Sequence, residues 1–423
     1  MGTIVRNSRQ DTGSSRLGKP YWTLWSAAVV NNTGDGVWTA ALPLLAASLT
    51  RDPIQVSAVA AATFLPWLLF SLVAGAVVDR RDRLRLMWRS QVFAGAVVVV
   101  TTALIAGHHA NIALLCAAGF LLGCADTVFG NASQSVLPEL VRRDQLVSAN
   151  SRSQVAQVLT TSFLGPPLGS LLFGITAWLA FGLDGASFVV AAILLATIRR
   201  PARTTARPVA VRGPIRREVA EGLRWLAGHR LLRTMALVFA ANCLCNQLAM
   251  ATLVLLATGK YRLDVHQYGL LLGVMAVGAM LSALLSKRLN ARFGPIRVTI
   301  IALAGNAAAY LAVGFAPNAV ALAVLLAVST AMTALWNVST VSVRQQLVPG
   351  ELLGRVNGAY RMLGWGLMPL GAALGGLLAT DFGIGVPFPV AGSLRALALL
   401  LALPVLLRHR RSYSTPNIST EVS

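Results

Sequence analysis

Long apolar segments that carry almost no charge dominate this sequence. Twelve follow one another along the 423 residues, at roughly 22–48, 54–78, 86–107, 111–131, 154–179, 182–198, 234–258, 267–286, 296–316, 318–338, 353–379 and 387–407. Each is near the length of about 20 residues that an α-helix needs to cross a bilayer. A span has to satisfy its own backbone hydrogen bonds there, which a helix does. The sequence therefore predicts an all-α polytopic membrane protein with twelve transmembrane helices.

The positions of the basic residues support this count. The loops expected on one side of the membrane hold all but four of the 36 Lys and Arg residues, the four being Arg51, Lys260, Arg262 and Arg395. Cytoplasmic loops are the ones enriched in Lys and Arg. We therefore expect both tails, 1–20 and 408–423, in the cytoplasm. The net charge of +21 is spread over these loops, so it does not indicate a nucleic-acid partner.

Two parts of the sequence resemble each other at an offset of about 207 residues. Leu140-Val141 with Asn150 matches Leu347-Val348 with Asn357, and Gly165-Pro166-Pro167-Leu168-Gly169 matches Gly371-Ala372-Ala373-Leu374-Gly375. A parallel repeat of this kind indicates two similar bundles of six helices. We expect the bundles at 21–198 and 234–407, joined by a cytoplasmic linker at 199–233 whose second part forms an amphipathic helix on the membrane surface.

A short basic loop lies between the second and third apolar segments. Its residues Gly75, Asp79, Arg80 and Arg83 resemble the corresponding loop motif of the major facilitator superfamily. Asp82 replaces the glycine usual at the middle of that loop. The alternative is a basic flank that stops translocation, with an incidental Asp79. If the resemblance holds, the motif closes the cytoplasmic gate against the eleventh helix.

This loop and three further stretches narrow the resemblance to the enterobactin-exporter and macrolide-efflux branch of this superfamily. They are Asn31-Asn32-Thr33-Gly34-Asp35-Gly36, Asp79-Arg80-Arg81-Asp82-Arg83, Glu221-Gly222-Leu223-Arg224-Trp225 and Gly354-Arg355-Val356-Asn357. The resemblance implies a secondary exporter of a drug, macrolide or siderophore, usually driven by proton exchange. An importer or lipid-moving permease of the same fold is the alternative. We expect a monomer in the membrane of a bacterial cell, with no cofactor and no enzymatic activity.

Asp35 is the strongest candidate for chemistry inside the membrane. It lies midway along the first apolar segment, and Asn31 precedes it by one turn on the same helix face. Insertion scales give a cost of about 2.5 to 3.5 kcal/mol for such a centrally placed Asp. Removal from water disfavours the charged form, so the carboxyl could bind and release a proton near neutral pH. The alternative is a structural carboxyl held by hydrogen bonds between helices.

Other polar residues in the apolar segments are candidates for the substrate cavity. Asp126 lies late in the fourth segment and Gln134 follows that segment, and Asp126 could instead cap or tether the loop that begins at Pro138. Amides at Asn242, Asn246 and Asn337 could contact substrate or join helices. At the offset of 207, Asn242 corresponds to Asp35, and an amide does not titrate.

The fifth apolar segment carries a motif that favours bending. Gly165, Pro166, Pro167 and Gly169 resemble the fifth-helix motif of proton-coupled antiporters, and Pro removes a helical hydrogen bond.

Arg395 lies inside the last segment, so that helix starts later than expected, the side chain reaches the surface, or it has a buried partner. The four cysteines all lie within apolar segments and do not indicate a metal site.

Overall fold

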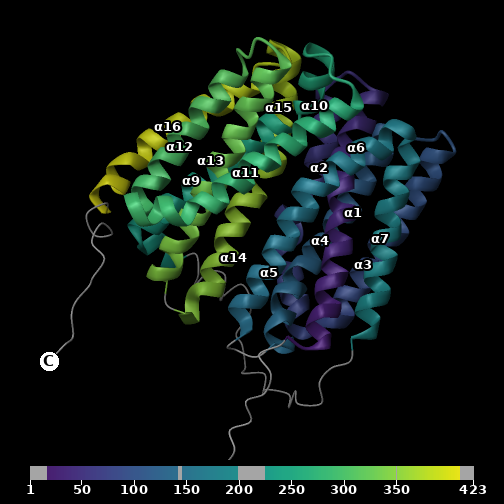
Figure 1. Cartoon of the computed structure of the whole chain (residues 1–423), viewed down its shortest axis with the longest axis horizontal. Coiled ribbons are helices and arrows are strands. Elements are labelled where there is room, and N and C mark those ends of the chain that lie inside the picture. The colour runs from purple at the N-terminus through teal and green to yellow at the C-terminus, as the bar shows by residue number, and fades with distance from the viewer. Residues whose placement is uncertain (1–16, 142–144, 199–223, 349, 410–423) are drawn as a thin grey trace, which may run out of the picture.

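The computed structural model describes residues 17–141, 145–198, 224–348 and 350–409, and nearly all of these are helical. The first half contains α1 (Lys19–Leu49), α2 (Pro53–Arg80), α3 (Arg83–Ala106), α4 (Ile112–Leu140), the continuous series α5 (Leu146–Gln157), η2 (Val158–Leu164) and α6 (Gly165–Ile175), and α7 (Ala177–Thr197). Here η marks a π-helix. The second half contains α9 (Arg230–Met250), α10 (Leu253–Leu255), η3 (Leu256–Lys260), α11 (Val265–Phe293), α12 (Pro295–Val313), α13 (Ala319–Leu347), α14 (Gly350–Gly366), α15 (Met368–Phe382) and α16 (Pro387–His409). Figure 1 shows the two halves side by side.

Eleven helical segments in the described part of the chain are long and apolar enough to span a membrane. The twelfth expected span, α1, has 31 residues but carries Asn31, Asn32 and Asp35 near its middle, which lower its hydropathy. It is the most central helix of the first half, since it contacts α2, α4, α6 and α7. The polar residues that weaken its membrane signal therefore lie where protein, rather than lipid, surrounds them.

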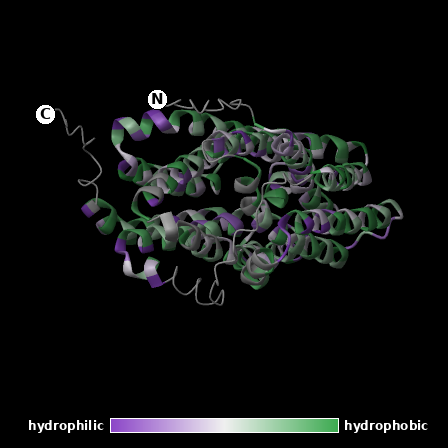
Figure 2. Cartoon of the chain, turned by 90° about the horizontal axis from the view of Figure 1, so that it is seen from below, coloured by the Kyte–Doolittle hydropathy of each residue, from purple (hydrophilic) through white to green (hydrophobic). Residues whose placement is uncertain are grey.

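Large apolar side chains cover the outer surface of the bundle. Leu284, Phe315, Val320 and Leu401 each expose at least 70% of their surface. Figure 2 shows hydrophobic residues along most of the helical length, with hydrophilic residues in short stretches. An apolar surface of this extent is stable only against lipid. The protein is thus a multi-pass membrane protein.

We call the end of the molecule that carries Arg83, Arg85 and Arg292 the basic end, and the opposite end, with Asp52 and Asp264, the far end. The halves contact each other through α2 with α15 and through α6 with α11. At the far end, Nη1 of Arg51 donates to Oγ1 of Thr258 across this boundary at 3.2 Å. Deeper along α2, the rings of Trp67 and Trp365 meet edge to face with centroids 4.5 Å apart.

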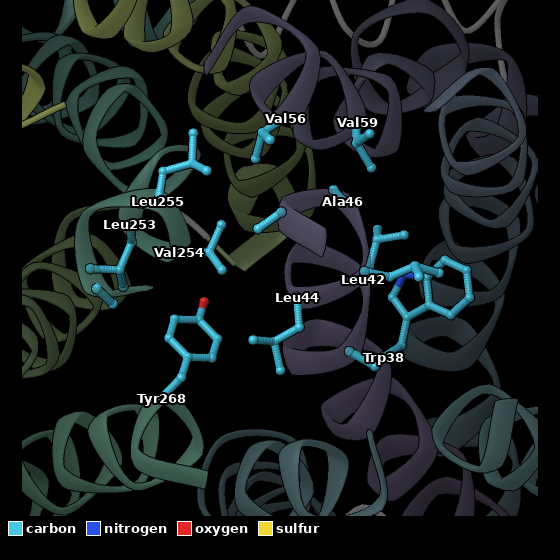
Figure 3. Packing of buried hydrophobic residues seen from close by; sticks show 14 of the residues in the cluster. Trp38, Leu42, Leu44, Ala46, Val56, Val59, Leu253, Val254, Leu255 and Tyr268 are labelled. Carbon is cyan, nitrogen blue, oxygen red and sulfur yellow. The ribbon is translucent and has the colours of Figure 1, made fainter. Parts of the chain in front are cut away.

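An apolar cluster fills the space between the halves toward the far end. In Figure 3 side chains of α1, α2, α10 and α11 converge, among them Leu44, Val56, Val254 and Tyr268. These four residues expose at most 4% of their surface. The buried apolar contacts hold the two halves together at this end.

Several boundaries differ from those expected from the sequence, and α4, α11 and α13 each continue well beyond the expected span. The basic loop after Gly75 is much shorter than expected, because α2 continues to Arg80 and only residues 81 and 82 separate it from α3. Asp82 accepts a hydrogen bond from the backbone N–H of Arg85 at 3.1 Å and so caps α3. The expected span 182–198 also begins too late, since extended backbone at Thr176 ends α6 and α7 starts at Ala177.

Candidate functional site

Three polar side chains form a hydrogen-bonded chain at the centre of the first half. Nδ2 of Asn31 donates to Oδ2 of Asp35 at 2.8 Å, one helical turn along α1. Nε2 of Gln91, on α3, donates to Oδ1 of Asn31 at 2.8 Å. Asn31 and Gln91 are buried, and Asp35 is partly exposed. The two amides hold the Asp35 carboxyl in one orientation near the middle of its helix.

Two further carboxyls lie close enough for their charges to act on Asp35. They are Asp126, at the middle of α4, and Asp184, on α7. Asp126 precedes Pro138 by 12 residues, about 18 Å along the helix, which is too far for the alternative role of tethering that loop. The described residues thus bring together acids from three helices of the first half.

Asp184 was missed in the sequence analysis. The expected span placed it at residue three of a helix, near the membrane surface, whereas it is the eighth residue of α7. It is 1% exposed, and its Oδ1 has no hydrogen-bond partner among the described residues. Gly34 makes room for it, because a Cβ at Gly34 would lie only 2.5 Å from this oxygen. The position of Asp184 inside a run of apolar residues is the sequence feature that could have identified it as a buried acid.

The exposure of the three acids differs. Asp184 is enclosed, Asp35 is partly exposed, and Asp126 is exposed although it lies at the middle of its helix. The charge of Asp126 acts on Asp35, so the two carboxyls lie near each other. Within the described parts of the chain, no three His, Cys, Asp or Glu side chains are close enough together to hold a metal ion.

The second half contains a cavity of about 190 Å³ between α9, α12, α13, α14, α15 and α16. The three amides expected to face a cavity, Asn242, Asn246 and Asn337, lie in its wall. The aromatic side chains of Phe239, Trp336 and Trp365 form part of the remaining wall of the cavity. The cavity therefore offers flat apolar surfaces together with hydrogen-bonding groups.

Several polar groups of this wall are partly occupied by neighbours within the same half. Nδ2 of Asn242 donates to the carbonyl oxygen of Val238 at 2.9 Å, and Oδ1 of Asn246 accepts from the hydroxyl of Tyr310 at 2.9 Å. Nδ2 of Asn306 donates to Oγ1 of Thr333 at 2.8 Å. Oδ1 of Asn306 is buried with no partner among the described residues. Hydrogen bonds within the protein thus hold one end of the side-chain amide of Asn242, Asn246 and Asn306.

Arg395 also lies in the cavity wall, and it is only 4% exposed. Its Cζ stands 4.0 Å from the centroid of the Tyr310 ring, and its Nη2 donates to the backbone oxygen of Asn242 at 3.2 Å. The helix α16 starts at Pro387, as expected. Of the three explanations offered for Arg395, a later helix start and a surface-reaching side chain are therefore wrong. The buried partner is the ring of Tyr310.

The bend motif lies where α6 crosses α1. The π-helix η2 ends directly before Gly165, whose N–H donates to the carbonyl oxygen of Thr160. Pro166 and Pro167 lack N–H groups and cannot donate to the preceding turn, and they lie in the first turn of α6, where the series changes from η2 to α6. A Cβ on Gly165 would overlap the backbone of Gly36, and a Cβ on Gly169 would lie 2.5 Å from the carbonyl oxygen of Val37. The glycines allow close packing of the two backbones.

The gate motif is only partly visible. The side chains of Gly75, Asp79 and Arg80 lie outside the described residues, as do the side chain of Gln134 and the residues 199–223 of the expected amphipathic linker. Arg83 is the first residue of α3 and has polar or charged neighbours. The expected latch and the linker helix stay predictions.

Comparison with known proteins places the chain in a family of transporters. A family model described as transmembrane secretion effector, of the major facilitator superfamily, matches residues 18–420. The multidrug efflux pump Tap of Mycobacterium tuberculosis is 30% identical over 404 residues, which cover 91% of both chains. The enterobactin exporter EntS of Salmonella typhimurium is 28% identical over 403 residues, again 91% of both chains.

Solved structures support the same fold. A bacterial homologue of the iron transporter ferroportin in an inward-facing state superposes with a TM-score of 0.71 at 17% identity, covering 92% of this chain and 98% of that chain. The outward-facing state of a bacterial ferroportin homologue gives a TM-score of 0.64 at 18% identity, covering 93% of this chain and 100% of that chain. Because the family match spans nearly the whole sequence, the protein belongs to the transmembrane secretion effector family of the major facilitator superfamily, whose members are transporters of small molecules and not enzymes.

Proposed function

We propose that this transporter exports a small molecule of the drug, macrolide or siderophore class from the cytoplasm, in exchange for protons. Two curated relatives that match along most of their length are a multidrug efflux pump and an enterobactin exporter, which favours outward transport. The excess of Lys and Arg at the basic end favours a cytoplasmic location for that end and for both chain termini.

The observation that carries the proton-exchange proposal is the polar network around Asp35. Among the described residues, its carboxyl accepts from Asn31, which accepts from Gln91. Asp126 and Asp184 add like charges nearby, and Asp35 keeps access to open space. A carboxyl in such surroundings can exchange a proton with the cavity and couple its charge state to substrate binding.

The arrangement of the halves fits the inward-facing stage of an alternating-access cycle. The Arg51–Thr258 hydrogen bond, the apolar cluster and the Trp67–Trp365 pair close the boundary between the halves toward the far end. The greater similarity to the inward-facing ferroportin homologue, with a TM-score of 0.71 against 0.64 for the outward-facing one, points the same way. In this state the polar groups of both halves would be reached from the cytoplasm.

The test is transport into everted membrane vesicles, whose lumen corresponds to the outside of the cell. A panel of macrolides, siderophores and cationic dyes is offered with an acidic lumen and again after the pH gradient is collapsed. We expect at least one compound to accumulate only with the gradient. The variant Asp35→Asn should remain in the membrane at normal amounts and lose the gradient-driven accumulation.

Asp381→Asn is the matched control, because Asp381 is an exposed acid near the far end of α15. It should transport like the unchanged protein. Gradient-driven transport that survives Asp35→Asn would remove Asp35 from the coupling mechanism. If no compound moved outward and a nutrient or lipid moved inward, the exporter proposal would be replaced by an importer or lipid-moving permease.

A further inference from the structure

Arg395 is a buried cation that faces a cavity without an acidic partner. Seven acidic residues have described side chains, namely Asp35, Asp52, Asp82, Asp126, Asp184, Asp264 and Asp381, and none of them lines the cavity. Buried charges in membrane helices are usually paired with an opposite charge or with backbone carbonyls. Arg395 meets this need only in part, through the backbone oxygen of Asn242 and the thiol of Cys245, neither of which is a carboxylate.

The remaining contacts of the guanidinium do not satisfy all of its N–H groups. One face covers the Tyr310 ring, with Cζ 4.0 Å from the ring centroid, and such stacking balances part of the charge. The Nε atom is buried and has no hydrogen-bond partner among the described residues. Arginine presents its N–H groups in a flat fork that matches a carboxylate. Stacking on Tyr310 holds this fork in a fixed plane.

The rest of the cavity suits a flat aromatic group. Phe239, Trp336 and Trp365 supply aromatic walls, and the rings of Phe239 and Trp336 stack with centroids 5.6 Å apart. The volume of about 190 Å³ is smaller than the roughly 300 to 1,000 Å³ of pockets that enclose a whole drug-sized ligand. The cavity therefore has room for one end of such a molecule.

We propose that the second-half cavity binds an aromatic, negatively charged end of the transported molecule, with Arg395 as its counter-charge. This inference rests on the proposed transport of a small molecule, and it adds a chemical class to the substrate. An anion bound there would neutralise Arg395, while Asp35 in the other half takes up the proton. Substrates with a carboxylate on an aromatic ring fit this site, whereas a cation would be repelled by Arg395.

The test uses the purified full-length protein and two probes of nearly equal size and shape, one negatively charged and one neutral. Binding of 2-naphthoate and of 2-naphthamide is measured by isothermal titration calorimetry. We expect the carboxylate to bind about tenfold more tightly or better, as charge-assisted hydrogen bonds predict. Equal affinities, a preference for the amide, or no binding of either probe would overturn the proposal. This comparison needs no variant, so it does not depend on how a substitution affects folding.

Variants then assign the preference to Arg395. Arg395→Gln should abolish the preference for the carboxylate, and Arg395→Lys should keep part of it, since lysine keeps the charge but not the fork. Arg292→Gln is the matched control, because Arg292 also stacks on an aromatic ring, that of Phe293, but is exposed outside the cavity. A preference that persists in folded Arg395→Gln protein would exclude Arg395 as the counter-charge.

One further arm separates this proposal from the proposed function. Asp35→Asn should bind the two probes with the same preference as the unchanged protein, even though it has lost gradient-driven transport. If transport were absent in all vesicle experiments but the carboxylate preference were present, only the exporter proposal would fail. The converse result, proton-driven export with no carboxylate preference, would leave the exporter proposal intact and reject the anion site.

Discussion

The first half of this transporter carries acids at its centre, and the second half carries amides and an arginine. Asp35, Asp126 and Asp184 act on one another in the first half. At the offset of 207 residues, these acids correspond to Asn242, Thr333 and Ala391, none of which is charged. Among the residues that the structure describes, Arg395 is the only cation that lines the second-half cavity. The two halves thus share one arrangement of helices but carry different polar side chains inside it.

The packing of the backbone is much more alike between the halves. Gly165 of α6 meets Gly36 of α1, and Gly371 of α15 meets the Leu244 carbonyl of α9. Phe181 and Phe388, also 207 residues apart, are both fully buried, although their ring partners Trp38 and Tyr310 come from the non-equivalent helices α1 and α12. The difference between the halves therefore lies in a few polar side chains. We infer that one half is specialised for protons and the other for the transported molecule.

The largest effect is expected from exchanging the residues Asp35 and Asn242 between the halves. The double variant Asp35→Asn with Asn242→Asp keeps the number of carboxyls but should not recover gradient-driven transport in everted vesicles. The positions that correspond to Asn31 and Gln91 are Val238 and Val298, so the moved carboxyl has no amides to orient it. It would also lie beside Arg395, whose Nη2 already donates to the backbone of residue 242.

The control for this exchange is the amount of protein in the membrane, measured in the same vesicles for each single variant and for the double variant. Recovery of more than half of the unchanged transport rate in the double variant would mean that the halves are interchangeable. The assignment of proton coupling to the first half and of substrate binding to the second half would then be wrong.

The fold could be predicted from the sequence because spans are long and their signal is local. Hydropathy located the helices, and the superfamily fold agrees with the family match. The spacing of Asn31 and Asp35 by one turn likewise follows from helix geometry alone. The predicted start of the sixth span was wrong because the residues around Thr176 are apolar on both sides, and only the backbone conformation shows where one helix ends.

Contacts between helices could not be predicted in the same way. Gln91 reaches Asn31 across 60 residues of sequence, and Arg395 stacks on Tyr310 across 85. Such pairs depend on the rotation of each helix about its axis, which a single sequence does not give. The role of Asp126 was left open for the same reason. The roles of all these residues in transport stay predictions until they are measured.

A smaller effect, on stability, is expected from substitutions that test whether the helices of the two halves pack alike. Gly165→Ala and Gly371→Ala should each lower the free energy of unfolding by about 1 to 3 kcal/mol, the usual result of inserting a methyl group into a tight contact. Gly358→Ala is the control, because nothing lies within 4 Å of a Cβ there and the position is an exposed part of α14. Thermal unfolding of the purified variants measures the difference. A strong effect in one half alone would show that the backbones do not pack alike.

The smallest effect is expected from Asp184→Asn, which tests whether the third acid serves transport at the expense of stability. The free energy of unfolding at pH 8 should rise by roughly 1 kcal/mol, because a neutral amide is easier to bury than an unpaired carboxylate. Gradient-driven transport should fall without disappearing, since Asp35 and Asp126 remain. Ser187→Ala is the control, as Ser187 is buried on the same face of α7 beside Gly34 and carries no charge. If Asp184→Asn were less stable and still transported fully, this acid would serve packing between α1 and α7, and the proton half would consist of Asp35 and Asp126.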